Sequence, residues 1–217
     1  MFLLLAKPSM DDETKNDNPW PKLGEPVFHR HARAPDPNWV FNACMDPWRS
    51  AHMIAQGYAD VAQLAFDRIA DTGDRGKNDT AVYAIVFNWR HYLELMLKDL
   101  LYLTRALVQN YVGKQVTHHK LSEIWTELRP FMEKLGGTEP ENFNKLDRVI
   151  NEFALYDPDS FAFRYATDTK GNISLPKIPS HLNLKNINER MTEVMRFLNA
   201  GWAYYADELS KLAEVDP

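Results

Sequence analysis

Residues 80–112, which read TAVYAIVFNWRHYLELMLKDLLYLTRALVQNYV, decide the fold of this chain. Apolar side chains recur in this stretch every three or four residues, the spacing that places them on one face of an α-helix. The pattern runs from Val82 to Tyr111, and Gly113 provides a stop. We therefore predict one helix of more than thirty residues, about 45–50 Å long at 1.5 Å per residue.

The same helical spacing appears in four further stretches. They cover about residues 47–71, 121–134, 138–154 and 184–213. Asp46 followed by Pro47 is typical of a helix start, and Gly73 is typical of a helix end. Together with the long helix, these stretches predict an all-α fold, a five-helix up-and-down bundle.

A different pattern occupies the connection between the fourth and fifth helices. Large aromatic side chains alternate with other residues over 161–166, a period of two that indicates a strand. Residues 168–172 have the composition of a turn, and 173–175 read as a returning strand. The sequence therefore predicts a small β-hairpin insertion, with Arg164 facing opposite the aromatic side chains.

The N-terminal region is rich in proline, with six of the 13 prolines among the first 38 residues. Proline cannot donate to a hydrogen-bond ladder and disfavours helix at the preceding residue, so this region should be irregular. We accordingly divide the chain into an irregular arm, residues 1–44, and a helical domain, residues 45–217. The arm carries Trp20, Phe28 and Trp39, which suit docking onto the domain or onto a partner protein.

Composition excludes several classes of protein. The 217 residues carry a formal charge of −5, which argues against a surface covered in positive charge. Cys44 is the single cysteine, so neither an internal disulfide nor a thiolate metal cluster can form. The glycine-rich phosphate loops, the GxSxG nucleophile motif and the HExxH zinc motif are missing, so we expect no cofactor and no metal. The apolar run 2–6 is too short to span a membrane, and we expect a cytoplasmic protein.

The long helix also carries a polar stripe. Arg90, Glu94 and Lys98 follow one another at intervals of four residues, with His91 beside them. Such a stripe is commonly a solvated face, in which each ion pair contributes about 0.2–0.5 kcal/mol. Bulky neighbours on both sides favour instead a half-buried stripe, which is costly unless its charges are paired or bind a ligand.

Three segments, taken in order, resemble one known protein family. Residues 87–98 (FNWRHYLELMLK), 118–125 (HHKLSEIW) and 157–165 (DPDSFAFRY) are similar to three consecutive motifs of bacterial HEPN (higher eukaryotes and prokaryotes nucleotide-binding) proteins. The resemblance extends over about residues 48–213 and does not cover the proline-rich arm. It implies an all-α bundle, usually a homodimer, often encoded in bacterial defence or toxin–antitoxin loci.

Many HEPN proteins are metal-independent ribonucleases, and their signature is an arginine followed, after four to six residues, by a histidine. The family's arginine would hold the phosphate, and its histidine would move protons during attack by the 2′-hydroxyl. None of the seven histidines here follows an arginine at that distance, and Trp202 stands at the corresponding distance after Arg196. The sequence therefore lacks the usual nuclease motif.

Three functions remain open. The first is binding of RNA, a nucleotide or a partner protein through a polar groove, with Arg90, Glu94, Lys98 and Arg164 as phosphate or ligand contacts. The second is a divergent metal-independent endoribonuclease, in which His91 and His119 are the catalytic candidates. The third is a structural subunit of a larger assembly. All three depend on the polar clusters of the three motifs meeting in one place.

Overall fold

The structure is a computed structural model that describes residues 43, 50–109, 116–136 and 139–215. The chain divides into two units, residues 1–46 and residues 47–217, and the described helices all belong to the second. The predicted arm therefore lies outside the described residues, except for residue 43. Asp46, Pro47 and Gly113, which were expected to mark helix ends, also lie outside them.

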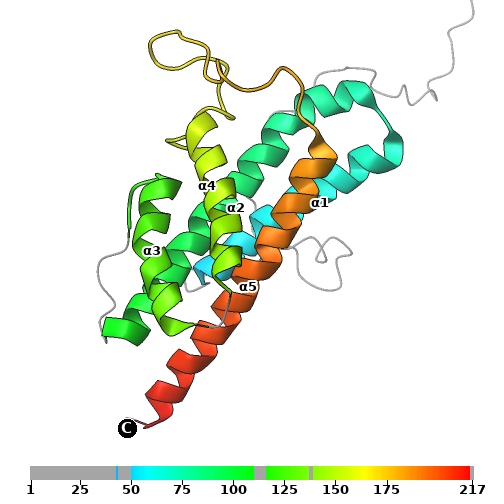
Figure 1. Ribbon diagram of the computed structural model, residues 1–217. Coiled ribbons are helices and arrows are strands. Elements are labelled where there is room, and N and C mark those ends of the chain that lie inside the picture. Colours follow the sequence, from blue (N-terminus) through cyan, green and yellow to red (C-terminus); the bar gives the residue numbers. More distant parts are fainter. Residues whose placement is uncertain (1–42, 44–49, 110–115, 137–138, 216–217) are drawn as a thin grey trace, which may run out of the picture. The chain divides into compact units, whose positions relative to one another are not determined.

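The described part of the chain contains five helices, which confirms the all-α prediction at this level (Figure 1). They are α1 (Ala51–Thr72), α2 (Arg75–Gln109), α3 (Leu121–Leu135), α4 (Pro140–Tyr156) and α5 (Leu184–Val215). Ser50 caps α1 by accepting a hydrogen bond from the backbone N–H of Met53, 3.3 Å away. Gly73 ends α1 with a φ of +62°, a left-handed conformation that glycine adopts without strain.

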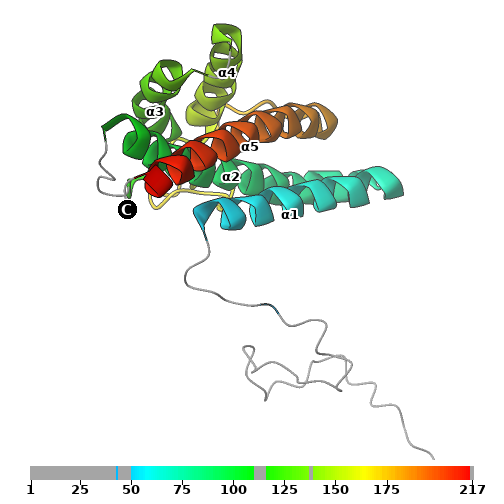
Figure 2. The ribbon, with the colours of Figure 1, turned by 90° about the horizontal axis from the view of Figure 1, so that it is seen from below.

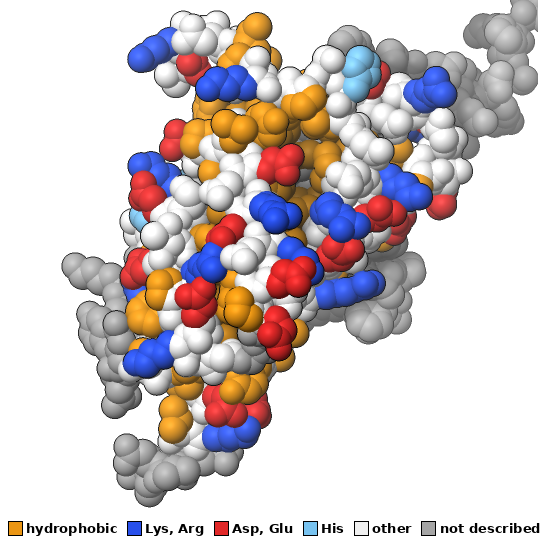
Figure 3. Space-filling view, viewed as in Figure 1, with side chains coloured by type: hydrophobic (Ala, Val, Ile, Leu, Met, Phe, Trp, Pro, Cys, Tyr) orange, Lys and Arg blue, Asp and Glu red, His pale blue; other side chains and the backbone are white. Residues whose placement is uncertain are grey.

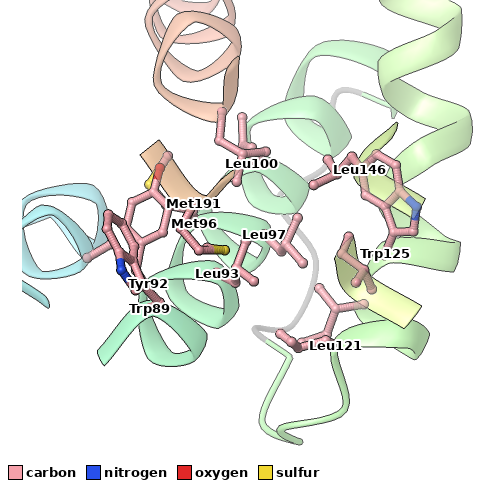
Figure 4. Close-up of a cluster of buried hydrophobic side chains, with 14 of the residues drawn as sticks. Trp89, Tyr92, Leu93, Met96, Leu97, Leu100, Leu121, Trp125, Leu146 and Met191 are labelled. Atoms are coloured by element: carbon pink, nitrogen blue, oxygen red, sulfur yellow. The ribbon is translucent and has the colours of Figure 1, made fainter. Parts of the chain in front are cut away.

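The long helix α2 lies at the centre of the core, as its apolar stripe predicts. It packs against α1, α3 and α5, and its larger side chains point toward residues from α3, α4 and α5 (Figure 4). Fully buried α2 residues include Trp89, Tyr92, Leu93, Met96, Leu97 and Leu100. On α1, small residues face this core: Ala55, Ala59 and Ala62 have no exposed surface, which lets the two helices approach closely.

The helices do not follow the predicted up-and-down order. His119, just before α3, contacts Glu94 in the middle of α2, and Glu127 of α3 contacts Arg105 further along α2. Helices α2 and α3 are therefore parallel, where an up-and-down bundle requires them to be antiparallel.

Two lengths explain this arrangement. From Glu94 to Gln109, α2 covers only about 22 Å, and the 11 residues between α2 and α3 can span more than that distance. Contacts of Tyr92 with Asn199 and of Asp99 with Trp202 show that α5 also runs parallel to α2.

The β-hairpin predicted between α4 and α5 is present only at its turn: residues 168–172 turn as expected, but no strand forms over 161–166. Residues 161–166 form a turn and an irregular segment, and pairing is limited to one antiparallel bridge between Thr167 and Ile173. The physical reason is Asp157, whose carboxylate oxygen Oδ1 accepts the backbone N–H groups of Phe161 at 2.7 Å and Ala162 at 2.9 Å. These donors close a tight turn and are not available to a neighbouring strand.

None of the described helices has the length and apolar character that crossing a bilayer requires.

Candidate functional site

Arg90 is the centre of the polar residues that the sequence singled out. Its side chain is completely buried on α2, and its guanidinium donates three hydrogen bonds. Nε donates to the backbone carbonyl of Asp157 at 3.1 Å, Nη1 to Glu94 Oε2 at 3.0 Å, and Nη2 to the backbone carbonyl of His119 at 2.7 Å. Arg90 thus connects α2 to the segment before α3 and to the end of α4.

Glu94 is a second buried charge on the same helix, and it is shared among three donors. Oε1 accepts from Lys98 Nζ at 2.9 Å and lies 2.7 Å from His119 Nδ1, while Oε2 accepts from Arg90. Burial alone would raise the pKa of Glu94, but the hydrogen bonds from Lys98 and His119 outweigh burial and lower this pKa. Glu94 is therefore an ionised carboxylate held in place by cationic and polar partners.

Asp157 completes the cluster. Besides accepting through its carbonyl, it places carboxylate Oδ2 3.3 Å from Arg90 Nε, an ion pair between two buried groups. Sequence reasoning did not single out this residue, although it is the first residue of the third family-like motif and directly follows α4. We call Arg90, Glu94, Lys98, His119 and Asp157 the Arg90 network. Its members come from all three motifs, so the three segments do meet.

The two segments that Arg90 connects are exposed just beyond the network. Residues 118–120 are exposed, as are Asp159, Arg164 and Tyr165 of the segment 159–165. The pKa of Lys120 is raised chiefly by its hydrogen bond to Glu123 and to a smaller extent by the charge of Asp159. Lys120 and Asp159 are therefore close enough to interact. We call the exposed side chains of residues 118–120 and 159–165 the two-loop surface.

Arg164 lies on the two-loop surface in a way that the sequence did not predict. Its Nη2 donates to the backbone carbonyl of Ser160 at 2.5 Å, and its guanidinium carbon lies 5.5 Å from the ring centres of both Phe87 and Tyr165. The predicted strand would have placed Arg164 opposite the aromatic side chains. The turn that replaces the strand, with Ser160 at a φ of +59°, instead stacks the arginine on aromatic rings.

His91 occupies a half-buried position next to the network. The ring of Tyr58 meets it edge-on at 4.3 Å, and the ring of Phe87 is parallel to it at 5.8 Å. Burial lowers the pKa of His91; the charge of Glu94 opposes this effect, while Arg90, His119 and Lys98 add to it. Since Phe87 also contacts Arg164, this ring links His91 to the two-loop surface.

The structure therefore separates the predicted site residues into two groups. Arg90 and Glu94 are buried and bonded to protein partners, so they hold neighbouring segments in position. His119 has 59% of its side chain exposed, Lys98 has 19%, and Arg164 is also exposed. These residues can meet a ligand, and His91 lies half-buried behind them.

His119 has the geometry of an oriented acid–base group. Its Nδ1 faces the Glu94 carboxylate, and no hydrogen bond or ion pair from another described residue involves its Nε2. A carboxylate on one ring nitrogen selects the tautomer in which the other nitrogen accepts a proton. The neighbouring His118 differs, because its Nε2 lies 3.8 Å from the exposed Glu123.

Within the described residues, no group of three or more His, Cys, Asp or Glu side chains is arranged to hold a metal ion.

Comparison of the chain with protein-family models, with curated protein sequences and with solved structures gives no match.

Proposed function

We propose that this chain is a HEPN-like protein that binds RNA through the two-loop surface, with the Arg90 network as the support that holds both segments in register. The observation that carries this proposal is the meeting of three separate motifs at Arg90. A buried ion-pair network is expensive to build, and here it fixes two short exposed segments that carry cationic and aromatic side chains. We further propose a homodimer associated with bacterial defence or a toxin–antitoxin system, which follows from the family resemblance, and a cytoplasmic location, which follows from the short apolar run at residues 2–6.

The chemistry of the two-loop surface suits single-stranded RNA. Arg164 stacks on the half-exposed Tyr165, whose ring in turn lies 4.6 Å from that of Phe161. An exposed aromatic ring accepts a base by stacking, and an adjacent guanidinium or ammonium group accepts a phosphate. Lys120 supplies a second cationic side chain, and the imidazole of His119 is exposed beside it. The overall charge of −5 argues against RNA binding over the whole surface of the chain.

A binding experiment tests this function directly. Fluorescence anisotropy with a labelled single-stranded RNA should show saturable binding that weakens roughly tenfold between about 50 and about 200 mM salt. Arg164→Ala and Tyr165→Ala should each weaken binding at least fivefold, because stacking contributes about 1–3 kcal/mol per base. Arg190→Ala and Tyr204→Ala are matched controls on exposed positions of α5 and should leave the affinity unchanged. The proposal is rejected if the control variants lose as much RNA affinity as the Arg164 and Tyr165 variants, or if the intact chain does not bind RNA.

The Glu94–His119 contact favours a second candidate function, a metal-independent endoribonuclease. In this candidate His119 Nε2 takes the proton from the attacking 2′-hydroxyl, and Glu94 holds the imidazole in orientation. The missing element is an arginine for the scissile phosphate. Arg90 is committed to protein partners, so Arg164 or Lys98 would have to provide this contact.

A cleavage assay separates the two functions. The intact chain is incubated with labelled RNA in EDTA, and the products are examined for 2′,3′-cyclic phosphate ends. If the chain is a nuclease, His119→Ala should slow cleavage by about 10²–10⁴-fold, whereas the adjacent His118→Ala should retain the rate. Binding without cleavage leaves the RNA-binding function. If the chain neither binds nor cleaves RNA, the result favours a structural subunit, which is the third hypothesis from the sequence.

A further inference from the structure

A cavity of about 200 Å³ lies outside the Arg90 network, between the end of α4, the start of α5 and the segment that connects them. Its most buried lining residues are apolar: Val86 of α2, Phe163 of the connecting segment and Met191 of α5 have at most 6% of their surface exposed. Figure 3 shows hydrophobic side chains gathered at this end of the helical unit, over the upper ends of α4 and α5. The opposite end of the same face shows mixed charges.

The mouth of the cavity is polar without a dominant charge. Glu152 and Arg190 are exposed residues of opposite sign that line it. Arg190 Nη1 also lies 2.9 Å from Glu193 Oε2, and His181 is a further exposed ionisable residue that lines the cavity. The side-chain groups of Asn186 and Tyr156 also line the cavity, and no described residue forms a hydrogen bond with them. A ligand here meets an apolar interior and an entrance that combines neutral hydrogen-bonding groups with residues of both charges.

From these features we infer a binding site for a small, uncharged ligand with an apolar body and one hydroxyl or carbonyl group. The volume supports a ligand smaller than a typical drug molecule, whose pockets measure about 300–1,000 Å³. The apolar body would contact Val86, Phe163 and Met191, and the polar group would meet Asn186 or Tyr156. The site is independent of RNA binding and stands even where that proposal fails.

The test uses the full chain with ¹³C-labelled methionine methyl groups and hexan-1-ol as the probe. Met191 lines the cavity, whereas Met53 is 54% exposed on α1 and serves as an internal reference; each signal is assigned by its Met→Leu variant. The Met191 methyl signal should shift saturably with a Kd of roughly 1–10 mM, and the Met53 signal should stay in place. Hexanoate and hexylammonium, which carry the same chain with a charge, should bind at least fivefold more weakly.

A matched pair of variants checks the location. Asn186→Trp places a large ring at the mouth and should weaken hexan-1-ol binding at least tenfold. Lys185→Trp adds the same ring at the neighbouring exposed position, which does not line the cavity, and should leave the Kd unchanged. The site is rejected if Met191 shows no saturable shift, or if both variants bind equally well. Tighter binding of either charged probe overturns the assignment to uncharged ligands.

Discussion

Replacing Arg90 with methionine is the sharpest perturbation of this molecule. Methionine retains much of the apolar stem and removes the guanidinium, so Glu94 and Asp157 lose the buried cation between them. Removing one partner of a buried ion pair costs about 3–5 kcal/mol, because an uncompensated charge remains in the interior. The estimated cost already includes the three hydrogen bonds that Arg90 loses, so their energies are not added separately.

Such a loss is a large part of the stability of a domain, which is typically about 5–15 kcal/mol. For a domain of this size, 1 kcal/mol corresponds to about 2–4 °C in the melting temperature, so Arg90→Met should melt about 6–20 °C lower. Urea unfolding followed by circular dichroism gives the free energy, and a thermal melt gives the second measure. Arg190→Met is the control, because its ion pair with Glu193 is half exposed and should contribute at most about 1 kcal/mol.

The double variant Arg90→Met with Glu94→Gln tests the cause of the loss. Removing the negative charge as well relieves part of the penalty, so the double variant should lose less than the sum of the single losses, by about 0.5–3 kcal/mol. The reasoning is refuted if Arg90→Met costs no more than Arg190→Met. It is also refuted if the two losses add, because Glu94 would then have no energetic link to Arg90.

Three further predictions concern pH and the backbone. The pKa of Glu94 is lowered in the folded state. The Glu94 carboxylate therefore stabilises the fold above its unfolded pKa, and this stabilisation is lost as the pH falls through the folded pKa. In urea unfolding, Glu94→Gln should lose less stability below about pH 4.5 than the parent chain does. The pKa of His91 is also lowered in the folded state, so just below about pH 6.5 the unfolded chain binds more protons and the free energy of unfolding falls. His91→Gln should therefore make the free energy of unfolding vary less with pH between about pH 7 and 5. An unchanged pH dependence would contradict the lowered pKa of His91. Gly73→Ala meets no atom within 4 Å but must adopt a φ of +62°, so calorimetry should show a loss of about 1–2 kcal/mol, whereas Gly57→Ala, inside α1 and also free of contacts, should gain up to about 1 kcal/mol.

The helices were predictable because their pattern is local. The apolar spacing of residues 80–112 predicts α2, and the structure confirms a helix there that begins slightly earlier, at Arg75. Gly73 was expected to end a helix and does so in the left-handed conformation. These features depend on residues a few positions apart, which interact whatever the rest of the chain does.

The roles of the candidate site residues were harder to predict. The polar stripe was recognised and a half-buried position was considered for it, but the sequence could not show that each nitrogen of the Arg90 guanidinium donates to a protein acceptor. Its partners are backbone carbonyls of His119 and Asp157, and carbonyl groups occur at every position and leave no mark in a sequence. The role of Asp157 was missed for a similar reason, because its carboxylate accepts the backbone N–H of Phe161 and so closes the turn there.

The number of helices, their approximate ends and the apolar face of each thus follow from the order of amino acids, because helix formation and amphipathic burial respond to neighbours three or four residues away. Two features follow only from the folded arrangement: the parallel course of α2 and α3 and the engagement of Arg90. Each depends on groups that are distant in the chain and close in space, such as Glu94 with His119 and Arg90 with Asp157. Their energies arise only when packing removes water and brings these groups within hydrogen-bonding distance.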